Sequence, residues 1–102
     1  MKRMRIEALI ASPPTLKCEK ILALLDEIST QFADRVQIDI YLAGEQPGTD
    51  PTKGYKDKGK FKRVPAVFVN GTMLIQAEVP ERAELDALVV RELAKGEDGW
   101  QD

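Results

Sequence analysis

The sequence contains no histidine and only one cysteine, Cys18. Without histidine the chain cannot assemble a Ser-His-Asp or Cys-His catalytic group, and it offers no imidazole ligand to a metal. A zinc site built from several cysteines and an intramolecular disulfide are excluded by the same count. One thiol is more typical of a reducing compartment than of a secreted disulfide scaffold, so we expect a cytoplasmic protein without a bound metal.

The chain also lacks a strong net charge and a long apolar run. It has 15 basic and 17 acidic residues and a net charge of −2, so no overall field attracts nucleic acid or an anionic membrane. Aromatic residues make up 6%, too few for a nucleic-acid groove. The first apolar run is interrupted by Glu7 and ends at Ser12, too short for a signal sequence or a membrane span. We expect a soluble protein without nucleic-acid or membrane partners.

The 102 residues, 43% of them hydrophobic, are enough for one domain over residues 1–102, with a core over about 5–93. An apolar strand is expected from Arg5 to Ala11. Apolar residues spaced by three and four then predict a helix from Leu16 to about Ala33, with Thr15 or Ser12 as its N-cap. Alternation over Val36–Leu42 predicts a second strand, parallel to the first.

The segment from Ala43 to Arg63 is the least regular part of the chain and is expected to be mostly solvated and mobile. Asp50 and Pro51 have the chemistry of a helix N-cap and first helical residue, and Gly59 suits the end of that short helix. Phe61 is expected to anchor the chain as it returns to the core. This segment therefore holds at most one short helix.

A β-hairpin follows, with strands over Ala66–Val69 and Thr72–Ala77 and an Asn-Gly turn that tolerates positive φ. A last amphipathic helix is predicted to begin around Pro80-Glu81 and to end at Lys95-Gly96. Residues 94–102 are expected to form a flexible tail. The fold class is α/β, in the order β-α-β-(α)-β-β-α, with a four-stranded mixed sheet and helices on both faces.

Two local patterns carry a family resemblance. Val64-Pro65 precedes the apolar run of the hairpin, and because cis peptides are largely confined to X-Pro bonds, it is the best candidate for a cis bond. Thr15-Leu16-Lys17-Cys18 lies at the expected helix start. From about Arg5 to Leu93 the chain resembles the thioredoxin/glutaredoxin superfamily, in which Cys-x-x-Cys stands where this chain has Thr15 and Cys18. The dithiol cycle of that family cannot operate here, since a hydroxyl replaces the first thiol.

The resemblance implies a site made by the helix start and the Val64-Pro65 segment. Cys18 would be the reacting sulfur, with Thr15 capping the helix and polarising the approach. Its burial on the apolar stripe would raise its pKa, whereas the helix N-terminus and Lys17 would lower it, so a reactive thiol and a small core residue both remain open. Thr-x-x-Cys also resembles the local pattern of peroxiredoxins, which implies a peroxidatic cysteine and a threonine that orients the peroxide.

Substrate binding is assigned to the other side of this site. The resemblance implies that Val64, before Pro65, offers its backbone to an extended substrate. Lys17 and Arg63 are the nearest cations, and Arg63 ends a basic run that suits an acidic partner, a phosphate or the carboxylates of glutathione, or is simply a solvated loop. That run comprises Lys53, Lys56, Lys58, Lys60, Lys62 and Arg63.

Two hypotheses follow. In the first, the protein is a single-cysteine thiol-disulfide oxidoreductase in cell redox homeostasis, acting on a protein or a small thiol or peptide substrate. It needs no bound cofactor, but glutathione or another external thiol would resolve its mixed disulfide. In the second, it is a non-catalytic binding or regulatory module of the same fold. A homodimer through the sheet edge or the last helix is compatible with either.

Overall fold

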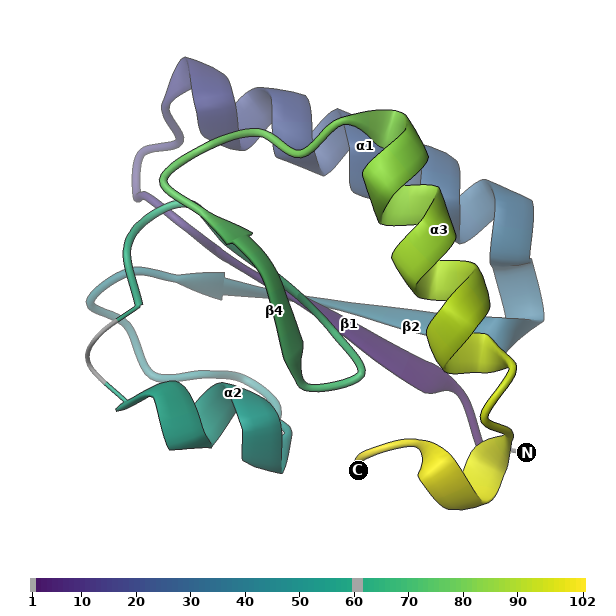
Figure 1. The fold of residues 1–102 in the computed structure, drawn as a ribbon. Helices are drawn as coiled ribbons and strands as arrows, with labels where there is room; N and C mark the ends of the chain where they lie inside the picture. The colour runs from purple at the N-terminus through teal and green to yellow at the C-terminus, as the bar shows by residue number, and fades with distance from the viewer. Residues whose placement is uncertain (1, 60–61) are drawn as a thin grey trace.

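The computed structural model describes residues 2–59 and 62–102 and contains seven main helices and strands among them (Figure 1). Two short 3₁₀ turns, η1 and η3, complete the described part of the chain. The elements are β1 (Met4–Ile10), α1 (Leu16–Phe32), η1 (Ala33–Arg35), β2 (Val36–Leu42), α2 (Lys53–Lys58), β3 (Ala66–Val69), β4 (Thr72–Gln76), α3 (Arg82–Leu93) and η3 (Glu97–Gly99).

The strands form one mixed sheet in the order β2-β1-β3-β4. β1 runs parallel to β2, with Met4 opposite Val36, and antiparallel to β3, with Leu9 opposite Ala66. β3 and β4 are antiparallel and form the predicted hairpin. Parallel strands require a crossover connection, which explains why a long helix, α1, separates β1 from β2 in the sequence. The predicted element order and four-stranded mixed sheet are confirmed.

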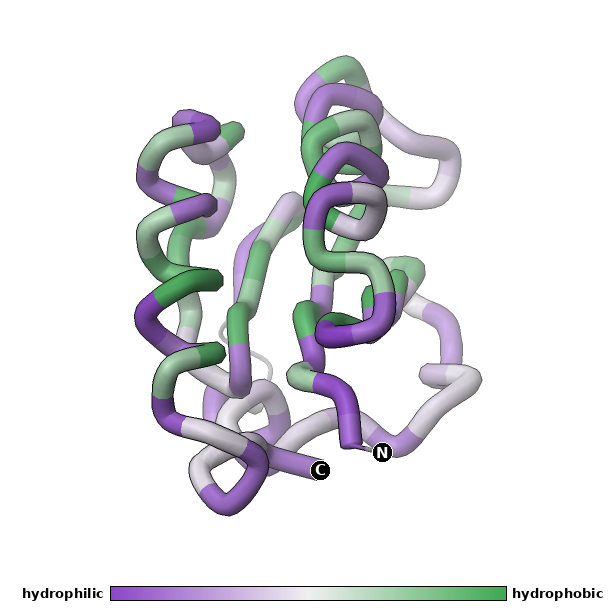
Figure 2. Tube along the Cα trace, turned by 90° about the vertical axis from the view of Figure 1, so that its right-hand side faces the viewer, coloured by the Kyte–Doolittle hydropathy of each residue, from purple (hydrophilic) through white to green (hydrophobic). Residues whose placement is uncertain are grey.

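Helices cover both faces of the sheet, as predicted. α1 and α3 share one face of the sheet, where their apolar side chains pack on alternate residues of β1 and β3. Figure 2 shows how apolar and polar stretches alternate along the chain. α2 lies on the other face, where Tyr55 packs between Tyr41 and Phe68 with ring centroids 4.8 and 4.9 Å apart. The central strands are therefore buried on both sides, which suits their nearly continuous apolar sequence.

Local chemistry accounts for most element ends. Thr15 is the N-cap of α1, where its Oγ1 accepts a hydrogen bond from the Cys18 N–H at 3.3 Å, so Ser12 does not cap the helix. Asn70 and Gly71 have φ of 50° and 75°, the positive values that the predicted hairpin turn needs. Gly59 ends α2 as predicted, but the N-cap of α2 is Thr52 rather than Asp50.

The segment between β2 and β3 is more buried than the sequence predicts. Thr52 is fully buried and Tyr55 is 7% exposed, so this part of the chain is anchored to the sheet rather than solvated throughout. Phe61, the predicted anchor, and Lys60 lie outside the described residues. The anchor that the structure does describe is therefore the α2 segment itself.

The chain after α3 packs against the domain instead of forming the predicted free tail. The Trp100 indole Nε1–H donates to the Glu92 carbonyl at 3.0 Å, and the Gln101 N–H donates to Asn70 Oδ1 at 2.7 Å. Asn70 Nδ2 in turn donates to Glu92 Oε1 and to the Gly99 carbonyl, each at 3.0 Å. The prediction was wrong because these partners are distant in sequence, and the buried amide of Asn70 requires them.

Candidate functional site

The start of α1 encloses the only sulfhydryl group of the chain. Cys18 is 0% exposed. Its Sγ accepts hydrogen bonds from the Thr15 hydroxyl at 3.2 Å and from the Ala11 N–H, just beyond β1, at 3.4 Å. Thr15 thus serves both the backbone and the sulfur of the same residue. The sequence left open whether Cys18 is a reactive thiol or a small core residue. The structure places it in a buried position.

These hydrogen bonds also set the acidity of the thiol. Burial raises the pKa of Cys18, but the hydrogen bonds from Thr15, Ala11 and the helix start favour the thiolate and together bring the pKa below its ordinary value. Lys17, which the sequence suggested would assist, is engaged elsewhere. Its Nζ donates to the Ala77 carbonyl at 2.8 Å and pairs with Glu78 at 3.5 Å. The thiol of Cys18 therefore has a lowered pKa but is enclosed by the protein.

The Val64–Pro65 segment and the start of α1 lie toward the same end of the sheet (Figure 1). The register of β1 with β3 places Pro65 beside the end of β1, and Ala77 joins it to the helix: its N–H donates to the Pro65 carbonyl at 2.7 Å, while its carbonyl accepts the Lys17 ammonium. The Val64–Pro65 peptide is cis, and so is Ser12–Pro13, which the sequence did not single out. The structure therefore brings the two sequence motifs to a common end of the domain.

Exposure divides the residues assigned to this site. Pro65 and Cys18 are buried, whereas Val64 is 36% exposed and Leu16, next to Thr15, is 67% exposed. We refer to exposed Thr15, Leu16 and Val64 as the α1–Val64 surface. It presents apolar side chains and backbone to solvent, and no sulfur.

Several cations of the basic run already have partners within the described residues. Lys53 pairs with Asp57 at 2.8 Å and Lys56 with Asp50 at 3.2 Å. Lys62 lies 4.1 Å from the centroid of the Tyr55 ring, and burial lowers its pKa. The neighbouring residue, Arg63, is exposed, and its backbone N–H donates to Gln76 Oε1 at 2.9 Å. Three of the cations, Lys53, Lys56 and Lys62, are thus engaged within the segment.

Sequence reasoning missed a buried polar network on the α2 face of the sheet. Glu7 is 0% exposed and accepts hydrogen bonds from the Tyr41 hydroxyl at 2.7 Å, the Thr52 N–H at 2.9 Å and the Thr52 hydroxyl. Arg5, 7% exposed, donates to Asp39 at 2.9 Å and to the Tyr41 hydroxyl at 3.0 Å. Among the described residues, every buried side-chain nitrogen and oxygen has a partner.

This network fixes α2 on the sheet and shifts the acidity of the tyrosines. Arg5 Nη1 also donates to the Asp50 carbonyl at 2.7 Å, two residues before the Thr52 cap. Burial, with the hydrogen bond to Glu7 adding to it, raises the pKa of Tyr41, and burial raises the pKa of Tyr55 to about 12. The available sequence signal was two charges at alternate positions of an apolar strand, Arg5 and Glu7, opposite a second strand that carries Asp39 and Tyr41.

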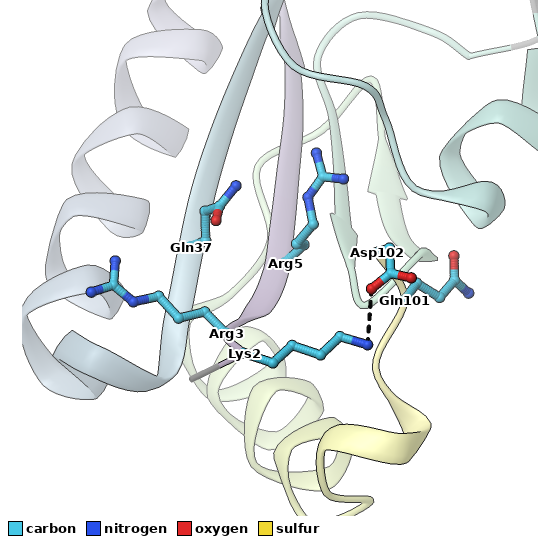
Figure 3. Close-up of a pocket in the computed structure, with 6 residues that line it drawn as sticks. All are labelled: Lys2, Arg3, Arg5, Gln37, Gln101 and Asp102. Carbon is cyan, nitrogen blue, oxygen red and sulfur yellow. Dashed lines mark ion pairs between the residues drawn. The ribbon is translucent and has the colours of Figure 1, made fainter.

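A shallow hollow of about 440 Å³ opens beside this network (Figure 3). Its cations are already paired: Lys2 with Asp102 at 3.1 Å, Arg3 with Asp34 at 3.8 Å, and Arg5 as described. Within residues 2–59 and 62–102, no group of three acidic, cysteine or histidine side chains could hold a metal ion. The same ranges contain no helix long and apolar enough to cross a bilayer.

Comparison with known proteins bears on the fold. No protein-family model and no curated protein matches the sequence. Among solved structures, the chain is similar to the germline-specific thioredoxin Deadhead of Drosophila melanogaster, with a TM-score of 0.51 and 8% identity over 87% of this chain and 80% of that one. A likeness at this identity concerns the fold rather than the activity. The chain therefore has a thioredoxin-like fold.

Proposed function

We propose that the protein is a thioredoxin-fold binding module that recognises an extended peptide at the α1–Val64 surface and performs no thiol exchange. The observation that carries the proposal is the complete burial of Cys18, whose sulfur is covered and hydrogen-bonded to Thr15 and Ala11. Thiol-disulfide exchange requires a thiolate to reach a disulfide sulfur in line, which an enclosed side chain cannot do. Recognition requires only the exposed groups beside it.

Val64 supplies the groups that a peptide needs. It lies immediately before Pro65 and β3, and among residues 2–59 and 62–102 no backbone hydrogen bond outside the helices and strands involves it. An extended peptide gains affinity from such open main-chain groups and specificity from neighbouring side-chain contacts. Leu16 and the Val64 side chain offer the apolar contacts, and Thr15 holds the helix start in place.

Thiol chemistry is the second candidate, and the lowered pKa of Cys18 favours it. If the α1 start opened, the thiolate would attack a substrate disulfide, release one substrate thiolate and form a mixed disulfide. Glutathione or another external thiol would then displace Cys18 and regenerate it. In this case binding would depend on the sulfur itself, which gives the two candidates different outcomes in one experiment.

That experiment is affinity capture from native lysate, with and without reductant, by four forms of the chain. We expect the wild type and Cys18→Ala to capture the same partner and the Leu16→Asp/Val64→Asp double variant to lose it. Val90→Asp is the matched control, because Val90 is another exposed apolar residue, 55% exposed on α3. Loss of capture in Cys18→Ala, with the wild-type complex released by reductant, would contradict the binding module and favour thiol exchange.

A further inference from the structure

The two edges of the sheet are not alike. β4, at one edge, has five residues, and its pairing with β3 shifts register between Val67 and Phe68. Such irregularity discourages further strands from adding. β2, at the other edge, has seven residues and pairs with β1 without a break from Val36 to Leu42. It contains no lysine, proline or bulge, three of the features that protect an edge, and the charge of its Asp39 is paired with Arg5 inside the sheet at 2.9 Å.

The open main-chain groups of β2 belong to its apolar residues. The Ala43 N–H donates to the Ile10 carbonyl at 2.8 Å. Because alternate residues of a strand face the same neighbour, the odd-numbered residues of β2 bond to β1. The N–H and C=O groups of the even-numbered residues therefore point away from the sheet. Those of Ile38 and Ile40 are open, whereas the Leu42 carbonyl already accepts the Glu45 N–H at 3.0 Å.

Apolar side chains stand beside those groups. A hollow of about 190 Å³ lies between α1 and β2, lined by Leu22, Leu25, Asp26 and Ser29 of the helix and by Ile38 and Ile40 of the strand. Ile40 is 37% exposed, one of the few exposed large apolar residues of the described chain. An added strand would bury this row while completing the backbone hydrogen bonds.

We propose that this edge binds a second copy of the chain, with the two β2 strands antiparallel and Ile40 opposite its own counterpart. In this register Ile38 faces Leu42 of the other copy, so apolar residues meet on the α1 side. A register centred one residue earlier would oppose the two Asp39 side chains, which like-charge repulsion disfavours. The surface lies apart from the α1–Val64 surface, so the inference does not depend on the proposed function.

The charges at the two ends of β2 favour a second copy as the occupant. Arg35 precedes the strand and Glu45 follows it, and both are exposed. Neither forms an ion pair with another residue in the described ranges. Antiparallel pairing brings the start of one strand to the end of the other, so Arg35 of each copy meets the region of Glu45 in the other. Two-fold symmetry makes this contact twice.

Sedimentation velocity of the full chain over a concentration series tests the proposal. The wild type should change from one to two chain masses with rising concentration, and Ile40→Lys should abolish the dimer. Val90→Lys, the matched exposed apolar control on α3, should leave it unchanged. A wild type that stays monomeric throughout, or a dimer that survives Ile40→Lys, would overturn the proposal.

Charge reversal tests the antiparallel register on exposed residues that do not support the fold. Arg35→Glu or Glu45→Arg alone should raise the dimer dissociation constant roughly tenfold, since each change creates two repulsive contacts. The Arg35→Glu/Glu45→Arg double variant should recover most of the wild-type affinity. Additive loss in the double variant would refute this pairing of strand ends.

Discussion

Removing the Glu7 carboxylate should destabilise the domain more than any surface change. In Glu7→Ala, the Tyr41 hydroxyl and both the N–H and hydroxyl of Thr52 lose their acceptor in a site that water does not reach. Arg5 keeps Asp39 but loses its second carboxylate, 3.8 Å away. An unsatisfied buried group costs about 1–3 kcal/mol, and breaking a buried ionic network costs roughly 3–5 kcal/mol in total.

We therefore expect Glu7→Ala to lose about 4 kcal/mol of unfolding free energy, a large part of the stability of a domain this size. Urea unfolding followed by circular dichroism measures it, and the midpoint should fall by roughly 2–4 M. Glu7→Gln keeps the volume and one acceptor and should lose about half as much, which supplies the measurement if the alanine variant does not fold. Amide exchange should rise first in α2, because Thr52 caps that helix.

The control for this prediction is Glu84→Gln, a change at an exposed carboxylate that should stay within about 0.5 kcal/mol of wild type. A loss below about 1 kcal/mol in Glu7→Ala would refute the reasoning. It would mean that α2 is held by its aromatic contacts alone and that the buried charges contribute little.

Four further predictions concern the N-cap of α1, the packed C-terminal segment, the close approach of α2 to the hairpin turn, and acid stability. Thr15→Ala removes the N-cap of α1 and a donor to Sγ, so urea unfolding should show a loss of about 1 kcal/mol and thiolate absorbance a higher Cys18 pKa. Trp100→Ala removes the bond to Glu92 and its packing, for a loss of about 2 kcal/mol in thermal unfolding. Gly54→Ala would place a Cβ against the Gly71 carbonyl oxygen, too close for the backbone to stay where it is, so amide exchange in α2 and the hairpin turn should accelerate. Burial raises the pKa of Glu92, but hydrogen bonds from Lys95 and Asn70 outweigh it and leave that pKa lowered. Its contribution is present above the unfolded carboxyl pKa and is lost as pH falls through the folded value, so the stability advantage of wild type over Glu92→Gln should shrink on acidification.

Each of these has a clear contrary result. An unchanged Cys18 pKa in Thr15→Ala would mean that the backbone amides alone acidify the thiol. An unchanged stability in Trp100→Ala would mean that the contacts of Trp100 contribute little, as in the flexible tail that the sequence predicted. Slow exchange retained in Gly54→Ala would show that α2 can shift without cost, and a pH-independent gap for Glu92→Gln would remove the carboxylate from the acid response.

The parts of the fold that were predictable depend on neighbours in sequence. β2 and β3 have the predicted bounds because alternation and the Asn-Gly turn are local signals. The N-cap of α2 was predicted two residues too early, at Asp50. The observed N-cap, Thr52, is held by a buried hydrogen bond to Glu7 that no local sequence pattern reveals. The packing of Trp100 on α3 was missed for the same reason.

The candidate site divides in the same way. Thr15 as N-cap follows from the local sequence, and its cap geometry is confirmed. Whether Cys18 faces solvent depended on where the chain leaves β1, because Ala11 and Thr15 together cover the sulfur. The position of Lys17 depended on Ala77, sixty residues away. Such contacts are set by tertiary packing, which outweighs helix-terminus arguments made from sequence alone.

The only thiol of this protein, Cys18, is enclosed in the folded state. The most direct measurement is the rate of Cys18 modification by a small thiol reagent in buffer and across the urea transition. We expect folded protein to react at least roughly a hundredfold more slowly than unfolded protein, with a rate that rises as the chain unfolds. A folded-state rate equal to or above that of the unfolded chain would contradict the binding module and make Cys18 a working nucleophile.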